Sequence, residues 1–384
     1  MNPLFANIPT TIFERMSMLA REHGATNLGQ GFPDFGWPED VVSRAAAELT
    51  GAASQYPPMR GLPELRQAVA DHYRAHQQID YSAEQVTITS GATEALAAAL
   101  LALIEPGDEV VLFQPLYDAY VPIIRRAGGI PRFVSLTPPD WRITAEALGA
   151  AFTDRTRLVV FNNPHNPTAR LFDAEELRVL GEACIRHDVV AVSDEVWEHV
   201  LFDDRRFVPL SAVAGMKDRT VKVGSAGKIF SLTGWKVGWI LAPDHLAGPI
   251  AKAHQFLTFT TPPNLQAAAA FGLGKAPDYF AGMRSNFQAA RDVMDQGLRD
   301  IGYVTLPSEG TYFLCIDLAA SGIDVDDMHF CLRAVEEAGV AAIPISPFYE
   351  DDPVRNVIRL CFAKKDETIE TGLAGMKTVR ALFG

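Results

Sequence analysis

The chain contains little cysteine and no long apolar run. Its cysteines are too far apart for a CxxC metal or redox motif and most lie in apolar segments, so we expect inert buried thiols and no metal site: Cys184, Cys315, Cys331 and Cys361. The longest apolar stretch, Ala95–Ile104, is shorter than the roughly 18 residues of a membrane span. The first residues lack the basic and apolar regions of a secretion signal. These absences predict a soluble protein of the reducing cytoplasm.

Positive charge is scarce as well, with 34 Lys and Arg against 47 Asp and Glu and a formal net charge of −13. An acidic chain lacks the basic face that nucleic acid or an anionic membrane requires, so we expect neither as a partner. Anionic small molecules remain compatible with this charge, because an acidic protein can hold a local basic pocket. The sequence also lacks GxGxxG and the P-loop motif, which argues against a nicotinamide dehydrogenase and a P-loop enzyme.

With 384 residues and 48% hydrophobic content, the chain is long enough for two domains with ample core. Its middle alternates short apolar runs with helical patterns, which predicts an α/β fold whose mostly parallel sheet is covered by helices. The predicted strands are residues 86–89, 109–113, 157–161, 189–193, 220–223 and 237–241, and the predicted helices are residues 92–104, 118–127 and 174–187. Ligands of such sheets bind beyond the carboxyl ends of the strands.

The pattern changes after Pro262 and Pro263. A helical stretch to about residue 300 is followed by strands at 310–316 and 357–362 and a helix at 328–338, which predicts a smaller α+β domain. We expect an N-terminal arm and part of the small domain at residues 1–45. The large domain is then expected at residues 46–275, and the rest of the small domain at residues 276–384.

The most informative segment is Ser225–Lys228, a turn of small residues that is followed by Lys236. A lysine amine can form a Schiff base with an aldehyde, and Ser225 and Lys236 could hold a phosphate. An aldehyde and a phosphate on one ligand describe pyridoxal phosphate (PLP). A second anion site is predicted at Ser90–Glu94, where free N–H groups open a helix directly after a strand, although an ordinary helix cap has the same sequence.

Three further polar residues stand in unusual positions. Asn166 follows a strand between two Asn-Pro steps, where it either meets a ligand or shapes a turn. Asp194 comes at the end of a buried strand and needs a cationic partner, such as a protonated pyridine nitrogen, unless it caps a helix. Arg359 is a lone arginine in an apolar strand, which indicates either a structural salt bridge or a bidentate contact with a substrate carboxylate.

Together these segments resemble the fold-type-I PLP-dependent enzymes, specifically the class I aminotransferases. The nearest sub-group is that of the kynurenine, glutamine and methionine aminotransferases. The resemblance extends from about Pro9 to the end of the chain. The matching segments are residues 27–35, 166–168, 194–196, 225–228, 233–239 and 358–362.

The resemblance implies a role for each cofactor-binding residue. Lys228 forms the Schiff base with PLP and then carries protons, Asp194 pairs with the pyridine nitrogen, and Asn166 donates to the phenolic oxygen. The phosphate is held by Gly91, Ala92, Thr93, Ser225 and Lys236, and Tyr117 stacks on the ring. Tyr56 matches a tyrosine that reaches the phosphate of the neighbouring subunit, which implies a homodimer with composite active sites.

The resemblance also implies how a substrate binds. Arg359 and Asn166 hold the α-carboxylate, and the Gly31 backbone lies beside the substrate. The side-chain pocket is lined by Phe13 and Tyr56 and, from the neighbouring subunit, by Phe259 and Thr260. Residues 258–262 contain no arginine for a dicarboxylate side chain. We therefore expect transamination between a 2-oxo acid and a neutral or aromatic L-amino acid, such as methionine, glutamine, phenylalanine or kynurenine.

Two residues depart from the family pattern. Trp197 stands where the family has a tyrosine that donates to the phenolic oxygen, and an indole N–H is a bulkier, donor-only group. Ala169 stands where the family has glycine, from which we expect a small backbone effect.

Alternative activities on the same scaffold stay open at this point. One is a cysteine-S-conjugate β-lyase, and another is an N-succinyldiaminopimelate aminotransferase, which would want extra cationic groups for a distal carboxylate. A PLP-fold sensor of the kind found in transcription regulators is disfavoured, because the chain is acidic and has no room for a DNA-binding domain before Gly29.

Overall fold

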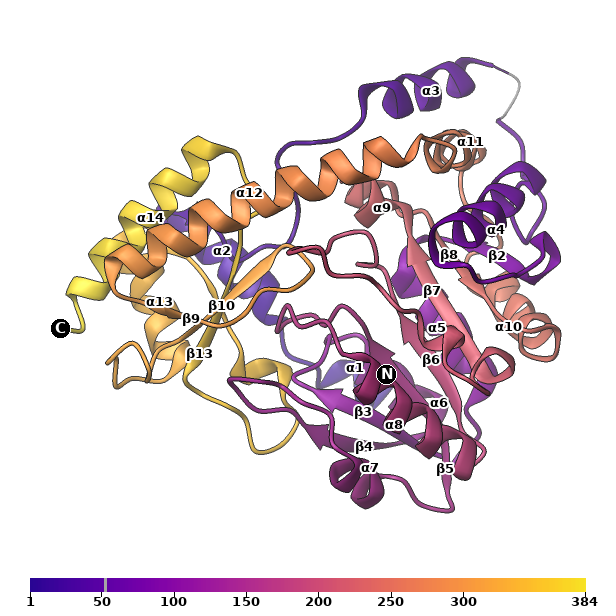
Figure 1. Ribbon diagram of the computed structural model, residues 1–384, viewed down its shortest axis with the longest axis horizontal. Helices are drawn as coiled ribbons and strands as arrows, with labels where there is room; N and C mark the ends of the chain where they lie inside the picture. The colour runs from indigo at the N-terminus through magenta and orange to yellow at the C-terminus, as the bar shows by residue number, and fades with distance from the viewer. Residues whose placement is uncertain (52–53) are drawn as a thin grey trace.

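A seven-stranded sheet forms the centre of the molecule in the computed structural model, which describes residues 1–51 and 54–384 (Figure 1). Its strands, in spatial order, are β2 (Val86–Thr89), β8 (Gly238–Leu241), β7 (Thr220–Ser225), β6 (Val190–Asp194), β5 (Thr156–Asn162), β3 (Glu109–Gln114) and β4 (Ile130–Ser135). β8 is antiparallel to both of its neighbours, and the other pairs are parallel. The expected mostly parallel α/β sheet is confirmed.

Helices cover this sheet, because strands that are apolar on both faces must be shielded from water on both sides. α5 packs against β6, β7 and β8, and α10 packs against α5. The helices of this part are α4 (Pro63–Gln77), α5 (Gly91–Leu103), α6 (Tyr120–Ala127), α7 (Ala145–Ala151), α8 (Ala174–Arg186), α9 (Ala226–Ile229), α10 (Asp244–Leu257) and α11 (Pro263–Leu273). Its 3₁₀ turns are η1 (Ala83–Gln85), η2 (Leu210–Ala212), η3 (Lys217–Arg219) and η4 (Thr233–Trp235).

The C-terminal part contains a small antiparallel sheet, in the order β12 (Ile343–Pro344), β13 (Val357–Cys361), β10 (Phe313–Asp317) and β9 (Val304–Thr305). β1 (Thr26–Asn27) pairs with β11 (Val340–Ala341), which brings the N-terminal segment to this part of the molecule. The remaining helices are α1 (Pro3–Ala6), α2 (Ile12–His23), α3 (Glu39–Thr50), α12 (Pro277–Ile301), α13 (Asp327–Ala338) and α14 (Asp366–Ala381), with the 3₁₀ turn η5 (Ser346–Phe348). Figure 1 shows α12 beside α14, reaching back toward α11.

Among the differences between the fold and the sequence patterns, two have a clear physical reason. The helical stretch after residue 262 is two helices, α11 and α12, because Gly274 ends the first and Pro277 starts the second. The edge strand β4 was not anticipated, since its residues are mostly half-buried or exposed and give no continuous apolar run. Along the described residues, no helix combines the length and apolar character of a membrane span.

The carboxyl ends of β5, β6 and β7 lie at one edge of the central sheet, because these three strands are parallel. Asn162 ends β5, Asp194 ends β6, and Ser225 ends β7. A ligand site is expected at this edge of an open α/β sheet.

Candidate active site

A cavity of about 200 Å³ lies at this edge of the sheet. Its walls contain most of the residues that the sequence singled out for a cofactor: Gly91, Ala92, Thr93, Tyr117, Asn166, Asp194, Trp197, Ser225, Lys228 and Lys236. Thus residues that are up to 145 positions apart, from Gly91 to Lys236, converge on one small space.

Lys228 reaches the cavity from α9, the single turn of helix that follows β7. Its Nζ donates to the hydroxyl of Tyr312 at 3.1 Å and lies 4.5 Å from the centre of the Trp197 ring. Burial lowers the pKa of Lys228 to about 8, with the Asp194 carboxylate opposing that change. An amine with this pKa is partly neutral near pH 7, as a nucleophile that attacks an aldehyde must be.

Asp194 is buried, and only one of its two carboxylate oxygens has a hydrogen-bond partner among the side chains of the described residues. Its Oδ2 accepts a hydrogen bond from the Tyr120 hydroxyl at 2.7 Å, whereas Oδ1 is buried without a partner among the described residues. Burial also raises the pKa of Asp194, because a charged carboxylate is costly in an apolar environment. A cationic N–H would satisfy Oδ1, and the protonated pyridine nitrogen of PLP has this chemistry. The site therefore fits the cofactor.

The part of the cavity beside the start of α5 is suited to a phosphate. The Ser90 side chain does not cap α5, so the first N–H groups of the helix remain available to an anion. Lys236 adopts a left-handed backbone conformation with φ of 54°, and a Cβ on Gly91 would lie 3.2 Å from its Cε. A Cβ on Gly238 would lie 2.6 Å from the carbonyl carbon of Gly91. Both glycines are needed for β8 and Lys236 to approach the start of α5 this closely.

Arg359 and Asn166 form a second polar unit beside the cavity. The Arg359 Nη1 donates to Oδ1 of Asn166 at 2.7 Å, and Nη2 donates to the carbonyl of Gly29 at 3.2 Å. The backbone N–H of Asn166 is in turn fixed by Oδ1 of Asn162 at 2.7 Å. These hydrogen bonds of Arg359 go to neutral oxygens, so the alternative of a structural salt bridge receives no support from them.

Aromatic rings surround the Arg359 guanidinium. Its central carbon is 3.8 Å from the ring centre of Phe313, 5.2 Å from that of Phe13 and 5.6 Å from that of Phe348. Burial lowers the pKa of Arg359 to about 10, so the side chain stays charged at pH 7. A buried cation whose Nε lacks a partner among the described residues, held between rings, is suited to an α-carboxylate.

The loop that contains Gly31 contacts this unit, because the Gly29 carbonyl accepts from Arg359. The Gly31 carbonyl accepts from the Tyr312 hydroxyl at 2.8 Å. A Cβ on Gly31 would lie 2.6 Å from the Phe313 ring, so only glycine fits between the loop and β10.

Tyr56, Phe259 and Thr260 do not line the cavity of their own chain. Tyr56 is 83% exposed and Phe259 is 39% exposed, and their ring centres are 5.6 Å apart on the surface. Their roles across a subunit boundary therefore stay predictions. The sequence analysis also missed Tyr120, Asn162, Tyr312, Phe313 and Phe348, most of which read as ordinary core or strand residues.

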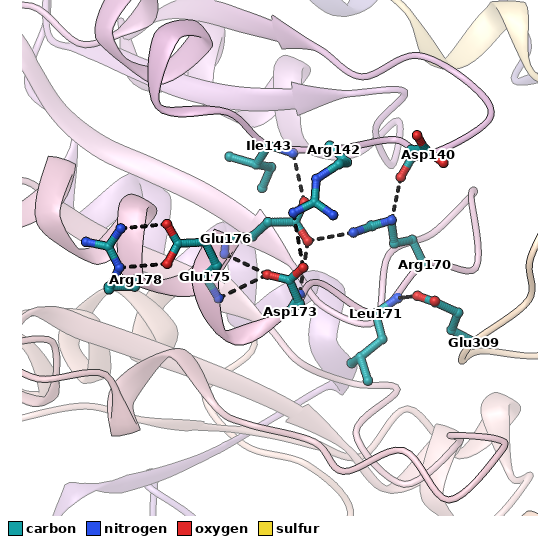
Figure 2. A network of polar contacts seen from close by, with 10 residues as sticks. All are labelled: Asp140, Arg142, Ile143, Arg170, Leu171, Asp173, Glu175, Glu176, Arg178 and Glu309. Atoms are coloured by element: carbon teal, nitrogen blue, oxygen red, sulfur yellow. Dashed lines mark hydrogen bonds and ion pairs between the residues drawn. The ribbon is translucent and has the colours of Figure 1, made fainter.

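A polar network anchors the loop between β5 and α8, which carries Asn166 (Figure 2). The buried Glu176 accepts from Arg170 Nη2 at 2.6 Å, from the N–H of Ile143 at 2.9 Å and from the N–H of Asp173 at 3.0 Å. The N–H of Leu171 donates to Glu309 at 2.9 Å, which ties the loop to the segment before β10.

Fold and site together define a PLP-dependent enzyme of fold type I. A model of the family "Aminotransferase class I and II" matches residues 24–375. The chain belongs to this family, and it is a PLP-dependent aminotransferase.

Similar proteins include a probable N-succinyldiaminopimelate aminotransferase of Mycobacterium tuberculosis, which is 40% identical over 95% of this chain and 94% of its own length. A methionine aminotransferase of Escherichia coli is 40% identical over 97% of this chain and 96% of its own. The solved N-succinyldiaminopimelate aminotransferase of M. tuberculosis superposes with a TM-score of 0.95 at 39% identity, covering 99% of this chain and 100% of that structure.

Proposed function

We propose that this enzyme moves an amino group between a 2-oxo acid and an L-amino acid with a neutral or aromatic side chain, such as methionine, glutamine, phenylalanine or kynurenine. The observation that carries the proposal is Arg359, a fixed charge held among the rings of Phe13, Phe313 and Phe348. An α-carboxylate on this guanidinium would place the rest of the substrate in an apolar setting. The similarity to a methionine aminotransferase supports the same substrate class.

Each residue of the site has a part in this proposal. PLP supplies an aldehyde and an electron-accepting ring when it is bound. Lys228 would hold it covalently and carry protons, Asp194 would keep the ring nitrogen protonated, and Trp197 and Tyr117 would line the space for the ring. Gly91, Ala92, Thr93, Ser225 and Lys236 would hold the phosphate, and Asn166 would bind both the phenolic oxygen and the substrate carboxylate. Gly31 leaves room for the substrate.

We also propose that the enzyme is a homodimer in which Tyr56, Phe259 and Thr260 complete the partner's site. Tyr56 is exposed and its ring packs against that of Phe259, and Phe256, three positions earlier in the chain, is 85% exposed; these exposed aromatic side chains support an interface at this surface. The four cysteines are all free and buried, which supports a reducing location such as the cytoplasm. The division at residues 45 and 275 is proposed as the boundary between the two domains.

The test is the visible absorbance of the purified protein with PLP, recorded after separate additions of methionine, glutamine, kynurenine and aspartate. We expect the absorbance of the bound cofactor to change with one or more of the first three and not with aspartate. Lys228→Ala should lose both the characteristic absorbance and turnover. Turnover that survives in this variant would contradict the role of Lys228. A response to aspartate alone would contradict the substrate class.

Products decide between transamination and β-lyase activity. A new amino acid formed from the added 2-oxo acid supports the aminotransferase, whereas pyruvate and ammonia from a cysteine conjugate would support the lyase.

A second candidate substrate class is favoured by another cavity. A space of about 650 Å³ is lined by Arg15, Arg125 and Phe348, and Phe348 also faces Arg359. Arg15 could therefore meet a distal carboxylate, as in an N-succinylated diamino acid. Arg15→Gln should then raise KM for N-succinyldiaminopimelate and leave KM for methionine unchanged. The control is Arg21→Gln, which changes an exposed arginine later in the same helix. If KM for N-succinyldiaminopimelate is the same in Arg15→Gln as in Arg21→Gln, this second substrate class is excluded.

A further inference from the structure

Tyr312 is the closest hydrogen-bonding partner of the Lys228 amine, and nothing in the sequence pattern had assigned it a role. Its hydroxyl has a single hydrogen, which it donates to the Gly31 carbonyl at 2.8 Å. Toward Lys228, at 3.1 Å, the same oxygen can therefore act only as an acceptor. An amine that donates an N–H to this oxygen keeps its lone pair free.

The backbone before Tyr312 is held in a conformation that sequence preference opposes. Thr311 is a buried β-branched residue with a φ of 64°, in the left-handed region that such residues rarely occupy. A Cβ on the preceding Gly310 would lie 2.9 Å from Pro164 and 3.0 Å from the Val200 carbonyl. The N–H of Thr311 also donates to the Val200 carbonyl at 3.0 Å. The surrounding structure thus fixes the direction in which Tyr312 enters the site.

The ring of Tyr312 is fixed as well. It meets the Trp197 ring at 90° with the centres 4.2 Å apart, and the Lys228 amine lies 4.5 Å from the centre of the Trp197 ring and 5.5 Å from that of the Tyr312 ring. Burial raises the pKa of Tyr312 well above its usual value, so the hydroxyl keeps its hydrogen throughout the working pH range.

We propose that Tyr312 is a positioning residue for the reaction: it holds the released amine of Lys228 by one N–H and leaves the lone pair free to take the α-proton of the substrate. The proton then resides on the amine as an ammonium group, whose N–H still donates to the Tyr312 oxygen and whose charge faces the Trp197 ring. The electron pair of the broken Cα–H bond stays with the substrate and the cofactor to which it is joined. This inference rests on the role proposed for Lys228.

The test compares Tyr312→Phe with Tyr303→Phe. Tyr303 is a matched control, because its buried hydroxyl also donates to a backbone carbonyl, that of Met376 at 2.9 Å, and it does not line the cavity that contains Lys228. Both variants should lose similar thermal stability. In a single turnover with L-methionine, Tyr312→Phe should be slower by about 10- to 100-fold, with the half-saturating concentration changed by less than about threefold. Tyr303→Phe should keep the rate of the parent enzyme.

A second readout does not depend on turnover. The rate at which the cofactor-free chain recombines with PLP reports the fraction of neutral Lys228 at each pH. Loss of an acceptor for the ammonium form should lower the apparent pKa of Lys228 by about 1 in Tyr312→Phe and leave it unchanged in Tyr303→Phe. If Tyr312→Phe folds poorly, 4-fluorophenylalanine at position 312 keeps the shape of the side chain with a fluorine that accepts hydrogen bonds only weakly and cannot ionise, and it should give changes in the same direction.

Identical rates and pH profiles in the two phenylalanine variants would overturn the inference and leave Tyr312 with a packing role. This outcome is distinct from failure of the proposed function, which would appear as cofactor absorbance and turnover that survive Lys228→Ala.

Discussion

At the scale of single residues, Asp194 is the side chain whose environment most needs a ligand. Its Oδ1 is buried without a partner among the described residues, and burial raises the pKa of the carboxyl. Asp194→Asn removes the charge that would keep a pyridine nitrogen protonated. We expect kcat to fall by at least about 100-fold, because the electron-accepting form of the ring is lost.

The same substitution should change how PLP affects thermal stability. Binding of PLP to the folded chain should raise Tm, and we expect a smaller rise in Asp194→Asn because the proposed charge-assisted contact would be lost. Tyr120→Phe is the control: it removes the hydrogen bond to Oδ2 at 2.7 Å and leaves the carboxylate in place. An equal rise in Tm for Asp194→Asn and the parent protein would show that the carboxylate does not contact the cofactor.

Trp197 is a second residue with a specific expectation. Its indole lies 4.5 Å from the Lys228 amine and lines the cavity, but it lacks the hydroxyl of the tyrosine that the family has here. Trp197→Tyr adds a donor that can stabilise the ionised phenolic oxygen. The pH midpoint of the cofactor's visible absorbance should therefore fall, with activity kept. An unchanged titration curve would mean that position 197 does not touch the cofactor.

The sequence identifies the residues whose chemistry is unusual for their position and misses those that depend on distant chain segments. Asp194 and Arg359 stand out because a charge in an apolar segment needs a reason, and Lys228 stands out as a lysine in a turn of small residues that is followed by a second lysine. Tyr120 and Tyr312 do not, since they lie 74 and 84 positions away from Asp194 and Lys228, and an aromatic residue in an apolar run is ordinary core. Only the fold brings them into contact.

At the scale of secondary-structure elements, the loop between β5 and α8 has an internal support that the sequence did not reveal. Glu176 is buried in the first turn of α8 and binds three donors, from Arg170, Ile143 and Asp173 (Figure 2). Glu176→Gln places an amide among these donors and leaves part of them unpaired. We expect the free energy of unfolding to fall by about 2–4 kcal/mol, measured by urea denaturation. KM for amino acids should rise, because Asn166 lies on this loop.

The neighbouring Glu175 supplies a matched control. It lies in the same turn of α8 and pairs with Arg178 on the surface, where both side chains are at least half exposed. Glu175→Gln should have a much smaller effect on stability and none on KM, since solvent screens exposed pairs. Similar losses in both variants would mean that the network does not support the loop.

Element prediction succeeded where a run of apolar residues is buried. The strands at 109–113 and 157–161 each contain four consecutive buried apolar residues after one charged residue, and both were located to within one residue at each end. The sequence did not predict β4, because an edge strand is half exposed to solvent and its residues Pro131 and Arg132 are typical of a loop. The break between α11 and α12 depends on Gly274 and Pro277, which could have been used as stop and start signals.

At the scale of the whole molecule, net charge is a poor guide to the site. The chain carries −13 overall, yet Lys228, Lys236 and Arg359 gather at one edge of the central sheet and its neighbouring loops. An acidic surface with a local basic site is compatible with anionic cofactors and substrates.

Buried histidines link the stability of the whole molecule to pH. Burial lowers the pKa of His72 to about 3 and that of His165 to about 3, whereas an unfolded histidine titrates near 6.5. Below pH 6.5 the two histidines bind protons in the unfolded chain but not in the folded chain. The stability that depends on their staying neutral is therefore fully present above pH 6.5 and is lost as the pH falls toward 3. When the pH is lowered from 7 to 5, each of the two histidines should lower the free energy of unfolding by about 2 kcal/mol.

His72→Gln tests this linkage away from the active site. His72 packs against His199, with their Nε2 atoms 2.7 Å apart, and its replacement removes one buried group that between pH 7 and pH 5 takes up a proton only in the unfolded chain. The variant is expected to be less stable at pH 7, but its free energy of unfolding should decline less steeply between pH 7 and pH 5. His245→Gln changes an exposed histidine in α10 and should keep the parent slope. Parallel curves for His72→Gln and the parent, measured by urea denaturation across this range, would show that His72 takes up its proton in the folded state as readily as in the unfolded one.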